Sequence, residues 1–195
     1  CMGRDIRYTL QALGLHNAHN SVGALAVVVA LERDPVAGAA AMSRSFRAAK
    51  HRLQSRETSD GLQILDDCYN ANPASMRAAL ETLDAVAAPG DRRVAVLGSM
   101  LELGPESARL HREIGVFASE CGLDRVFVTG PYADALAEGA RAGGLKAVSA
   151  AADVVAHLDA IKRETTSGWL LLKGSRGGRL ERVLDLFDLK EADGS

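Results

Sequence analysis

The chain has 195 residues, of which 47% are hydrophobic, and its formal net charge is −2. That length suits one domain of ordinary size plus part of a second, and the apolar share is enough for a buried core. The nearly balanced charge gives no electrostatic reason to expect nucleic acid or an anionic membrane as a partner. No apolar run approaches the roughly 20 residues of a membrane span, and the first residues lack the apolar core of a secretion signal.

The first 50 residues are predicted to contain a short strand and two helices. We expect a strand over residues 7–15 and an Ala- and Val-rich helix over residues 18–33. Asp34-Pro35 predicts the start of a second helix that runs to about Phe46, because Asp caps a helix well and Pro is tolerated in its first turn.

The rest of the chain predicts strands that alternate with helices. Residues 53–58 and 62–66 are expected to pair as a hairpin around Ser59-Asp60-Gly61. Further strands are predicted over residues 93–97, 125–129, 146–149 and 169–172. Helices are predicted over residues 74–87, 107–121, 132–142, 152–165 and 179–187. This alternation predicts an α/β fold with a mostly parallel sheet and flanking helices.

Four loops that follow predicted strands carry Gly, Pro and small polar residues. They are residues 66–73, 98–100, 129–131 and 173–178. Open parallel sheets bind ligands beyond the carboxyl ends of their strands. The sequence therefore predicts a ligand site along one edge of the sheet.

The first of these loops, Asp-Asp-Cys-Tyr-Asn-Ala-Asn-Pro at residues 66–73, gathers two carboxylates, two carboxamides and a phenol. Such groups can accept from a ribose hydroxyl, hold Mg²⁺ or orient a ligand. Each of them could instead serve the turn or cap the next helix, but for the whole set we favour ligand binding. Of the two adjacent carboxylates, we expect Asp67 to lie deeper in the loop than Asp66.

The loop at residues 173–178 combines Lys173 and Arg176 with three glycines. Glycine lets backbone N–H groups approach an anion, and an Arg can grip a carboxylate or phosphate with two parallel bonds. The pattern favours an anion site. A flexible surface loop with solvated charges is the alternative.

Other polar residues carry weaker signals. Asn17 and Asn20 are spaced to share one helix face and could read a purine edge, although Asn17 could equally cap the helix. Arg52 would ordinarily be a surface ion-pair residue, and His111 is predicted on an exposed, solvated helix face. The three cysteines are scattered and odd in number, which predicts free thiols in a cytoplasmic protein. No Gly-x-x-x-x-Gly-Lys-Ser/Thr phosphate loop occurs.

Taken in order, these segments resemble the Mur ligase family, and within it the ligases that add D-alanyl-D-alanine. The resemblance covers residues 10–187. It rests on His-Asn-Ala-His-Asn at 16–20, Arg52, the block at 66–73, Leu-Gly-Ser-Met-Leu-Glu-Leu-Gly at 97–104, His-Arg-Glu at 111–113 and Lys-Gly-Ser-Arg at 173–176.

The resemblance implies a division of the chain. Residues 1–50 would end a central ATPase domain, and residues 51–189 would form a Rossmann-like C-terminal domain. The polar composition of residues 190–195 predicts a disordered tail. The phosphate loop and the metal ligands would lie in upstream domains, so no metal ligand is predicted here. The chain alone is then expected to be inactive.

The resemblance also implies roles for named residues. Asn17 and Asn20 would contact the adenine of ATP, while Arg52 and Asp67 would contact the nucleotide and act in catalysis. Five residues would face the dipeptide, with Ser175 and Arg176 ranked above Lys173, which could pair with a carboxylate instead: Asn70, Asn72, Lys173, Ser175 and Arg176.

The implied reaction belongs to peptidoglycan-precursor synthesis. ATP, with Mg²⁺, would activate the terminal carboxylate of UDP-N-acetylmuramoyl-tripeptide as an acyl phosphate, which the amine of D-alanyl-D-alanine would attack. A sister Mur ligase or a folylpolyglutamate synthase relative is an alternative, against which the residues at 69–73 argue. A stand-alone Rossmann-like binding module without ATPase activity is another.

Overall fold

The computed structural model describes residues 5–47 and 49–190. Most of the tail expected at residues 190–195 therefore lies outside the described residues. Lys190 is described, and its backbone N–H donates to the carbonyl of Glu57 at 2.9 Å.

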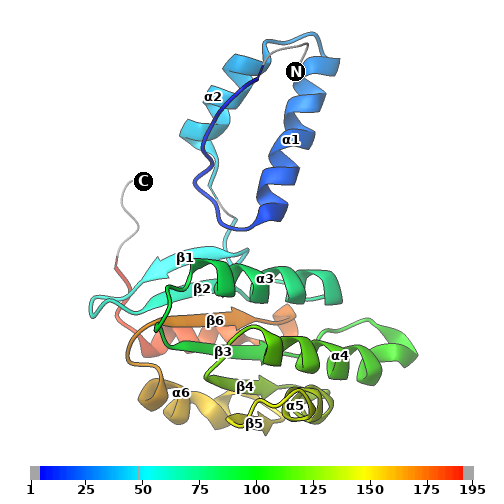
Figure 1. The fold of residues 1–195 in the computed structure, drawn as a ribbon, viewed down its shortest axis with the longest axis vertical. Helices are drawn as coiled ribbons and strands as arrows, with labels where there is room; N and C mark the ends of the chain where they lie inside the picture. The colour runs from blue at the N-terminus through cyan, green and yellow to red at the C-terminus, as the bar shows by residue number, and fades with distance from the viewer. Residues whose placement is uncertain (1–4, 48, 191–195) are drawn as a thin grey trace.

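A six-stranded sheet forms the centre of the larger part of the molecule (Figure 1). A hairpin of two antiparallel strands forms one side, and the other neighbouring pairs are parallel. In spatial order the strands are β1 (Gln54–Glu57), β2 (Gln63–Asp67), β6 (Trp169–Lys173), β3 (Arg93–Gly98), β4 (Arg125–Thr129) and β5 (Val148–Ala151). The predicted α/β fold with a mostly parallel sheet is confirmed.

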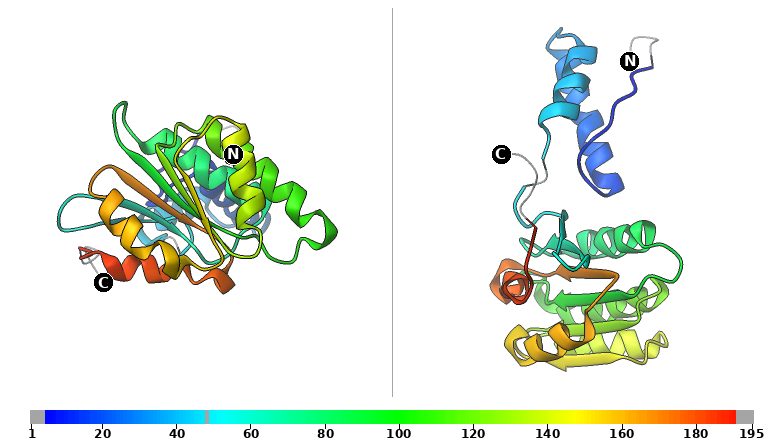
Figure 2. Two further views of the ribbon diagram at one scale, coloured as in Figure 1. Left: turned by 90° about the horizontal axis from the view of Figure 1, so that it is seen from below. Right: turned by 90° about the vertical axis from the view of Figure 1, so that its left-hand side faces the viewer.

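Helices cover both faces of this sheet (Figure 2). One apolar core lies under α3 (Pro73–Val86), α4 (Ser107–Glu120) and α5 (Ala133–Ala142). The opposite core lies under α6 (Leu158–Glu164) and the 3₁₀ helix η4 (Leu180–Leu186). Because both faces are covered, the central strands are apolar throughout, as in the buried run Val94–Leu97.

Two predicted helices differ from the expectation. The helix expected at residues 152–165 begins as the 3₁₀ helix η2 (Val154–His157), whose first turn is capped by Asp153, and continues as α6. The helix expected at residues 179–187 is the 3₁₀ helix η4. Arg179, its N-cap, has a left-handed φ of 49°, so the helix begins at Leu180 and not at the expected residue 179.

The helices α1 (Leu15–Ala30) and α2 (Pro35–Ser45) lie beside each other and stand away from the sheet (Figure 1). The predicted start of α2 is confirmed, since the Asp34 carboxylate accepts from Val36 N at 2.9 Å. Among the described residues, none of the helices has the length and apolar character to cross a membrane.

The strand predicted over residues 7–15 is wrong. The described part of this segment is irregular, and α1 already begins at Leu15. The segment packs along α1, where the Tyr8 hydroxyl shares a 2.7 Å hydrogen bond with Ser21 Oγ. A strand needs a neighbour to satisfy its backbone, and the six-stranded sheet lies elsewhere.

The packing of α4 on α5 depends on glycines. A Cβ added at Gly139 would lie 2.0 Å from Arg112 O, and one added at Gly115 would lie 2.1 Å from Leu136 O. Both positions face backbone atoms of the partner helix, which cannot move aside as a side-chain tip can. The two helices can therefore approach this closely only where no side chain intervenes.

Gly139→Ala should lower the free energy of unfolding by about 1–3 kcal/mol, the usual scale of overpacking. Gly23→Ala, in the open on α1, is the matched control and should be neutral or stabilising by up to about 1 kcal/mol. Urea denaturation of both variants checks this. Equal stability of the Gly139 variant and the wild type would contradict the close-packing interpretation.

Candidate functional site

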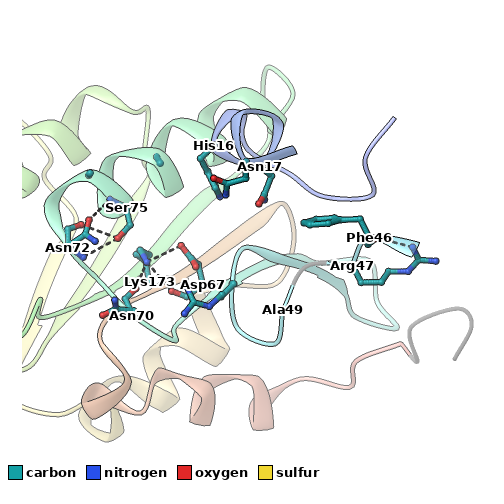
Figure 3. Close-up of a pocket in the computed structure, with 14 residues that line it drawn as sticks. His16, Asn17, Phe46, Arg47, Ala49, Asp67, Asn70, Asn72, Ser75 and Lys173 are labelled. Carbon is teal, nitrogen blue, oxygen red and sulfur yellow. Dashed lines mark hydrogen bonds and ion pairs between the residues drawn. The ribbon is translucent and has the colours of Figure 1, made fainter. Parts of the chain in front are cut away.

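A cleft of about 540 Å³ lies between the start of α1, the linker that follows α2, and the carboxyl ends of β2 and β6 (Figure 3). It is lined by His16, Asn17, Asn20, Phe46, Arg47, Ala49, Arg52, Asp67, Asn70, Asn72, Ala74, Ser75, Ala78 and Lys173. Parallel strands place their carboxyl ends at one edge, as the sequence predicts. Seven of the nine predicted site residues meet here, and Ser175 and Arg176 do not line the cleft.

The helix α1 contributes the two predicted carboxamides, Asn17 and Asn20, from its first turns. Asn17 does not cap the helix, because the N-cap is Gly14 and forms no side-chain cap. Its Nδ2 instead donates to Leu13 O at 2.7 Å. This bond holds the carboxamide at the cleft wall.

The opposite wall is built on an ion pair between Asp67 and Lys173. The two residues are register partners at the ends of β2 and β6, and Lys173 Nζ lies 2.9 Å from Asp67 Oδ2. Nζ also donates to the carbonyls of Asp67, at 3.4 Å, and of Asn70. Three acceptors account for the three protons of the ammonium group. The alternative that Lys173 pairs with a carboxylate is therefore what the structure shows.

Burial acts on both members of this pair. The side chain of Lys173 is 2% exposed and that of Asp67 is 16% exposed. Desolvation lowers the pKa of Lys173 and raises the pKa of Asp67, while their mutual attraction opposes both shifts. Each charge thus depends on the other, and removing either one would leave an uncompensated charge in a buried site.

The neighbouring Asp66 points to the opposite face of β2. Its side chain is fully buried, with His51 Nδ1 at 2.8 Å and Arg56 Nε at 3.0 Å from Oδ2. The expectation that Asp67 lies deeper than Asp66 is wrong. Successive strand residues face opposite sides, and β2 turns Asp67 toward the cleft and Asp66 into the protein.

Among the described residues, His51, Asp66 and Cys68 form the one group spaced closely enough to hold a metal ion. The Arg56 guanidinium already occupies Asp66 Oδ2. Burial, followed by the negative charge of Asp66, raises the pKa of the Cys68 thiol, so its sulfur stays protonated and donates to Asp66 Oδ1. We interpret the group as a hydrogen-bonded cluster.

The two asparagines of the 66–73 loop are partly engaged in local structure. Asn72 caps α3 in a reciprocal capping box, in which its Oδ1 accepts from Ser75 N at 2.8 Å. Asn70 Oδ1 accepts from Ala71 N at 2.9 Å. The turn-forming alternative therefore holds for Asn72, yet both side chains still line the cleft.

Ser175 and Arg176 lie outside the cleft lining. Ser175 is buried, and its Oγ accepts from Leu101 N at 3.1 Å. Arg176 is exposed, with its guanidinium 5.4 Å from the centre of the Tyr69 ring. The Arg52 guanidinium lies over the same ring at 4.5 Å. Tyr69 thus connects the predicted dipeptide loop to the linker.

Sequence reasoning missed the linker residues Phe46 and Arg47 and the helix residues His16 and Ser75 as cleft residues. A usable signal lay in the linker, where Arg47, Lys50 and Arg52 make a basic run. A run of this kind beside a ligand cleft favours an anionic ligand.

Comparison with known proteins identifies the family to which this fold and cleft belong. Residues 51–176, more than half of the chain, match the family model described as Mur ligase, glutamate ligase domain. The chain belongs to the Mur ligase family. The matched range begins in the linker and ends at Arg176, so it includes the Asp67–Lys173 wall of the cleft.

Several relatives of this Mur ligase chain are ligases for D-alanyl-D-alanine. The UDP-N-acetylmuramoyl-tripeptide–D-alanyl-D-alanine ligase of Bacillus subtilis is 34% identical over 95% of this chain and 41% of the relative. A crystal structure of MurF from Acinetobacter baumannii has a TM-score of 0.80 at 30% identity, over 92% of this chain and 39% of that one. MurF from Thermotoga maritima in complex with ADP has a TM-score of 0.66 at 27% identity, over 84% and 35%. The chain thus spans about two fifths of the length of these relatives.

His111 in the family-like His-Arg-Glu segment is buried, so the prediction of a solvated helix face is wrong for it. Met100 N donates to its Nε2 at 2.7 Å, and Ser107 O lies 2.6 Å from its Nδ1. Nε2 must accept and Nδ1 must therefore carry the proton, which defines a neutral ring. This ring, stacked on Tyr132, ties the loop after β3 to α4.

Acid should destabilise the chain through this ring. Burial lowers the pKa of His111 below its usual 6.5, so below that pH the unfolded chain binds the proton more readily than the folded chain. The free energy of unfolding should stay level above about pH 7 and fall by up to about 1.4 kcal/mol per pH unit below 6.5.

His111→Gln, which keeps an acceptor for Met100 N but cannot titrate, should flatten this slope. Burial also lowers the pKa of His157, so part of the slope should remain. Urea denaturation of both proteins at several pH values checks this. An equally steep slope in the variant would show that His111 is not the group responsible.

Proposed function

We propose that this chain is the C-terminal part of an ATP-dependent, cytoplasmic ligase that joins D-alanyl-D-alanine to UDP-N-acetylmuramoyl-tripeptide. The proposal is supported by the relatives named for that reaction and by one structural observation. Seven polar residues from four separate segments converge on one cleft: Asn17, Asn20, Arg52, Asp67, Asn70, Asn72 and Lys173. Likenesses to an alanine-adding Mur ligase and a folylpolyglutamate synthase, at 18% and 19% identity, support the fold alone.

The cleft suits a nucleotide. Its volume of about 540 Å³ lies within the usual range for ligand sites, roughly 300–1,000 Å³. Asn17 and Asn20 offer donors and acceptors for an adenine edge, and Arg52 offers a cation for the phosphates. Asp67 is the one carboxylate among the lining residues, and it already pairs with Lys173. We therefore expect the ligands of Mg²⁺ outside this chain.

For the dipeptide we propose Arg176 as the cation that meets its carboxylate. Arg176 is exposed and lies near Tyr69, whereas the ammonium protons of Lys173 already have protein acceptors. Lys173 would then act indirectly, by holding the loop from Asp67 to Asn70 in place. Asn70 and Asn72 would line the path between the nucleotide and the dipeptide.

The proposed reaction transfers the γ-phosphoryl group of ATP to the carboxylate of the precursor. The neutral amine of the dipeptide then attacks the acyl phosphate and releases inorganic phosphate. Arg52, beside the cleft, would stabilise the charge that spreads over the transferred group. Closing the cleft would align the reactants and exclude water.

The 195-residue chain alone should not turn over ATP, because it contains no phosphate loop of the Gly-x-x-x-x-Gly-Lys-Ser/Thr type. The whole ligase containing it should release phosphate only when both the tripeptide precursor and D-alanyl-D-alanine are present. Phosphate release assays on both proteins test this. A whole ligase that accepts single amino acids but not the dipeptide would overturn the proposed substrate.

Within the whole ligase, Arg52→Ala and Arg176→Ala should affect different substrates. Arg52→Ala removes the cation that would contact the transferred phosphoryl group, so it should lower the turnover number with ATP by roughly 10³-fold, by analogy with arginine fingers. Arg176→Ala should lower kcat/KM for the dipeptide by the equivalent of about 2 kcal/mol, the scale of one charge-assisted hydrogen bond. The KM for ATP should stay unchanged.

Saturation curves for each substrate separate the two effects. Arg112→Ala is the control, because Arg112 is also exposed but pairs with Glu138 on α5. If Arg176→Ala moves the ATP curve and not the dipeptide curve, the loop at 173–178 serves the nucleotide.

A further inference from the structure

We propose that His51 and Asp66 form a positioning pair that holds the linker in a strained conformation and so presents Arg52 to the cleft. The inference rests on the proposed function only for what Arg52 meets there. Its structural basis is independent of any substrate.

The backbone on either side of Arg52 is strained. His51 has a φ of 60° and Leu53 has a φ of 48°, both in the left-handed region that residues with a Cβ avoid. A conformation of this kind persists only where surrounding contacts hold it.

Asp66 holds the first of these residues. Both of its carboxylate oxygens lie within hydrogen-bond distance of His51 Nδ1, at 3.0 and 2.8 Å. Asp66 is fully buried within β2, so it offers a fixed point on the sheet. The His51 carbonyl also accepts from Tyr69 N at 3.1 Å. His51 is thus tied to the sheet domain through its ring and through its backbone.

Leu53 is held by Asp67 and by the hydrophobic core. Leu53 N donates to Asp67 Oδ1 at 3.1 Å, and the Leu53 side chain is 2% exposed. Two adjacent carboxylates therefore fasten the two neighbours of Arg52, one from each face of β2. Hydrogen bonds to a charged partner are about twice as strong as neutral ones, which suits them to hold strain.

Arg52 itself remains outside these contacts. Its side chain is exposed, lies over the Tyr69 ring at 4.5 Å and lines the cleft. Its backbone N–H donates to Ala49 O at 3.0 Å. The residues on either side of Arg52 are thus held by contacts with the sheet domain, whereas its guanidinium is exposed and can meet a ligand. His51 and Asp66 are positioning residues, since neither is proposed to touch substrate.

A double-mutant cycle in the whole ligase tests this role. His51→Ala should lower kcat/KM for ATP about tenfold, the equivalent of one lost interaction of ordinary strength. In the Arg52→Ala background the same change should cost less than about twofold, because the residue that it positions is already gone. A tenfold loss in both backgrounds would show that His51 acts through general stability, and would overturn the proposal.

His157→Ala is the matched control for stability. His157 is a buried histidine whose Nε2 lies 3.3 Å from Val128 O, on β4 and away from the linker. Any loss of kcat/KM for ATP that His157→Ala causes should be the same in the wild-type and the Arg52→Ala backgrounds. Dependence of this control on Arg52 would equally overturn the specific role of His51.

A second measurement needs no substrate. In the 195-residue chain, ¹⁵N relaxation should give the Arg52 amide an order parameter near that of rigid backbone, about 0.85, and His51→Ala should lower it toward the flexible range, below about 0.6. His157→Ala should leave it unchanged. An Arg52 amide that stays rigid without the His51 ring would overturn the proposal. If the whole ligase does not use D-alanyl-D-alanine, the proposed function fails, yet this measurement still decides the role of His51.

Discussion

A buried ammonium group determines the geometry of the cleft. Lys173 ends β6 almost without solvent contact, and a charge in that position needs partners from the protein. Its partners are the carboxylate and carbonyl of Asp67 and the carbonyl of Asn70. The loop after β2 must therefore fold back over the end of β6. That folding brings Asn72 to the start of α3 and sets the wall against which α1 closes the cleft.

The pleat of β2 gives two identical side chains different tasks. Asp67 faces the cleft and pairs with Lys173, whereas Asp66 faces the opposite core and pairs with His51 and Arg56. A shift of one residue in the register of β2 would exchange these two faces. The parallel pairing with β6 fixes the register over five residues, and the apolar side chains of Ile64 and Leu65 fix it again. The acidic pair can thus serve both sides of the sheet at once.

Local sequence patterns predicted most of the fold and the edge of the sheet at which the cleft lies. Short apolar runs separated by helical segments predicted the strands. Because parallel strands end at the same edge of a sheet, the sequence also predicted the edge where Asp67 and Lys173 meet. The patterns failed where long-range contacts decide the outcome. His111 is buried and accepts from Met100 N, a contact that no helical periodicity reveals. The insertion of β6 between β2 and β3, and the left-handed conformation of His51, likewise depend on partners far along the chain.

The contacts of the linker also define which residues move together. His51 and Leu53, on either side of Arg52, are fastened to the end of β2 and to Tyr69, whereas Asn17 and Asn20 belong to α1. A rotation of α1 and α2 against the sheet would therefore have to turn the chain on the N-terminal side of His51. Arg52 would then travel with Asp67 and Lys173, and the carboxamides would travel with the helices. The nucleotide proposed for this cleft would contact both groups only where the helices and the sheet enclose it, so its higher affinity for that arrangement would drive closure.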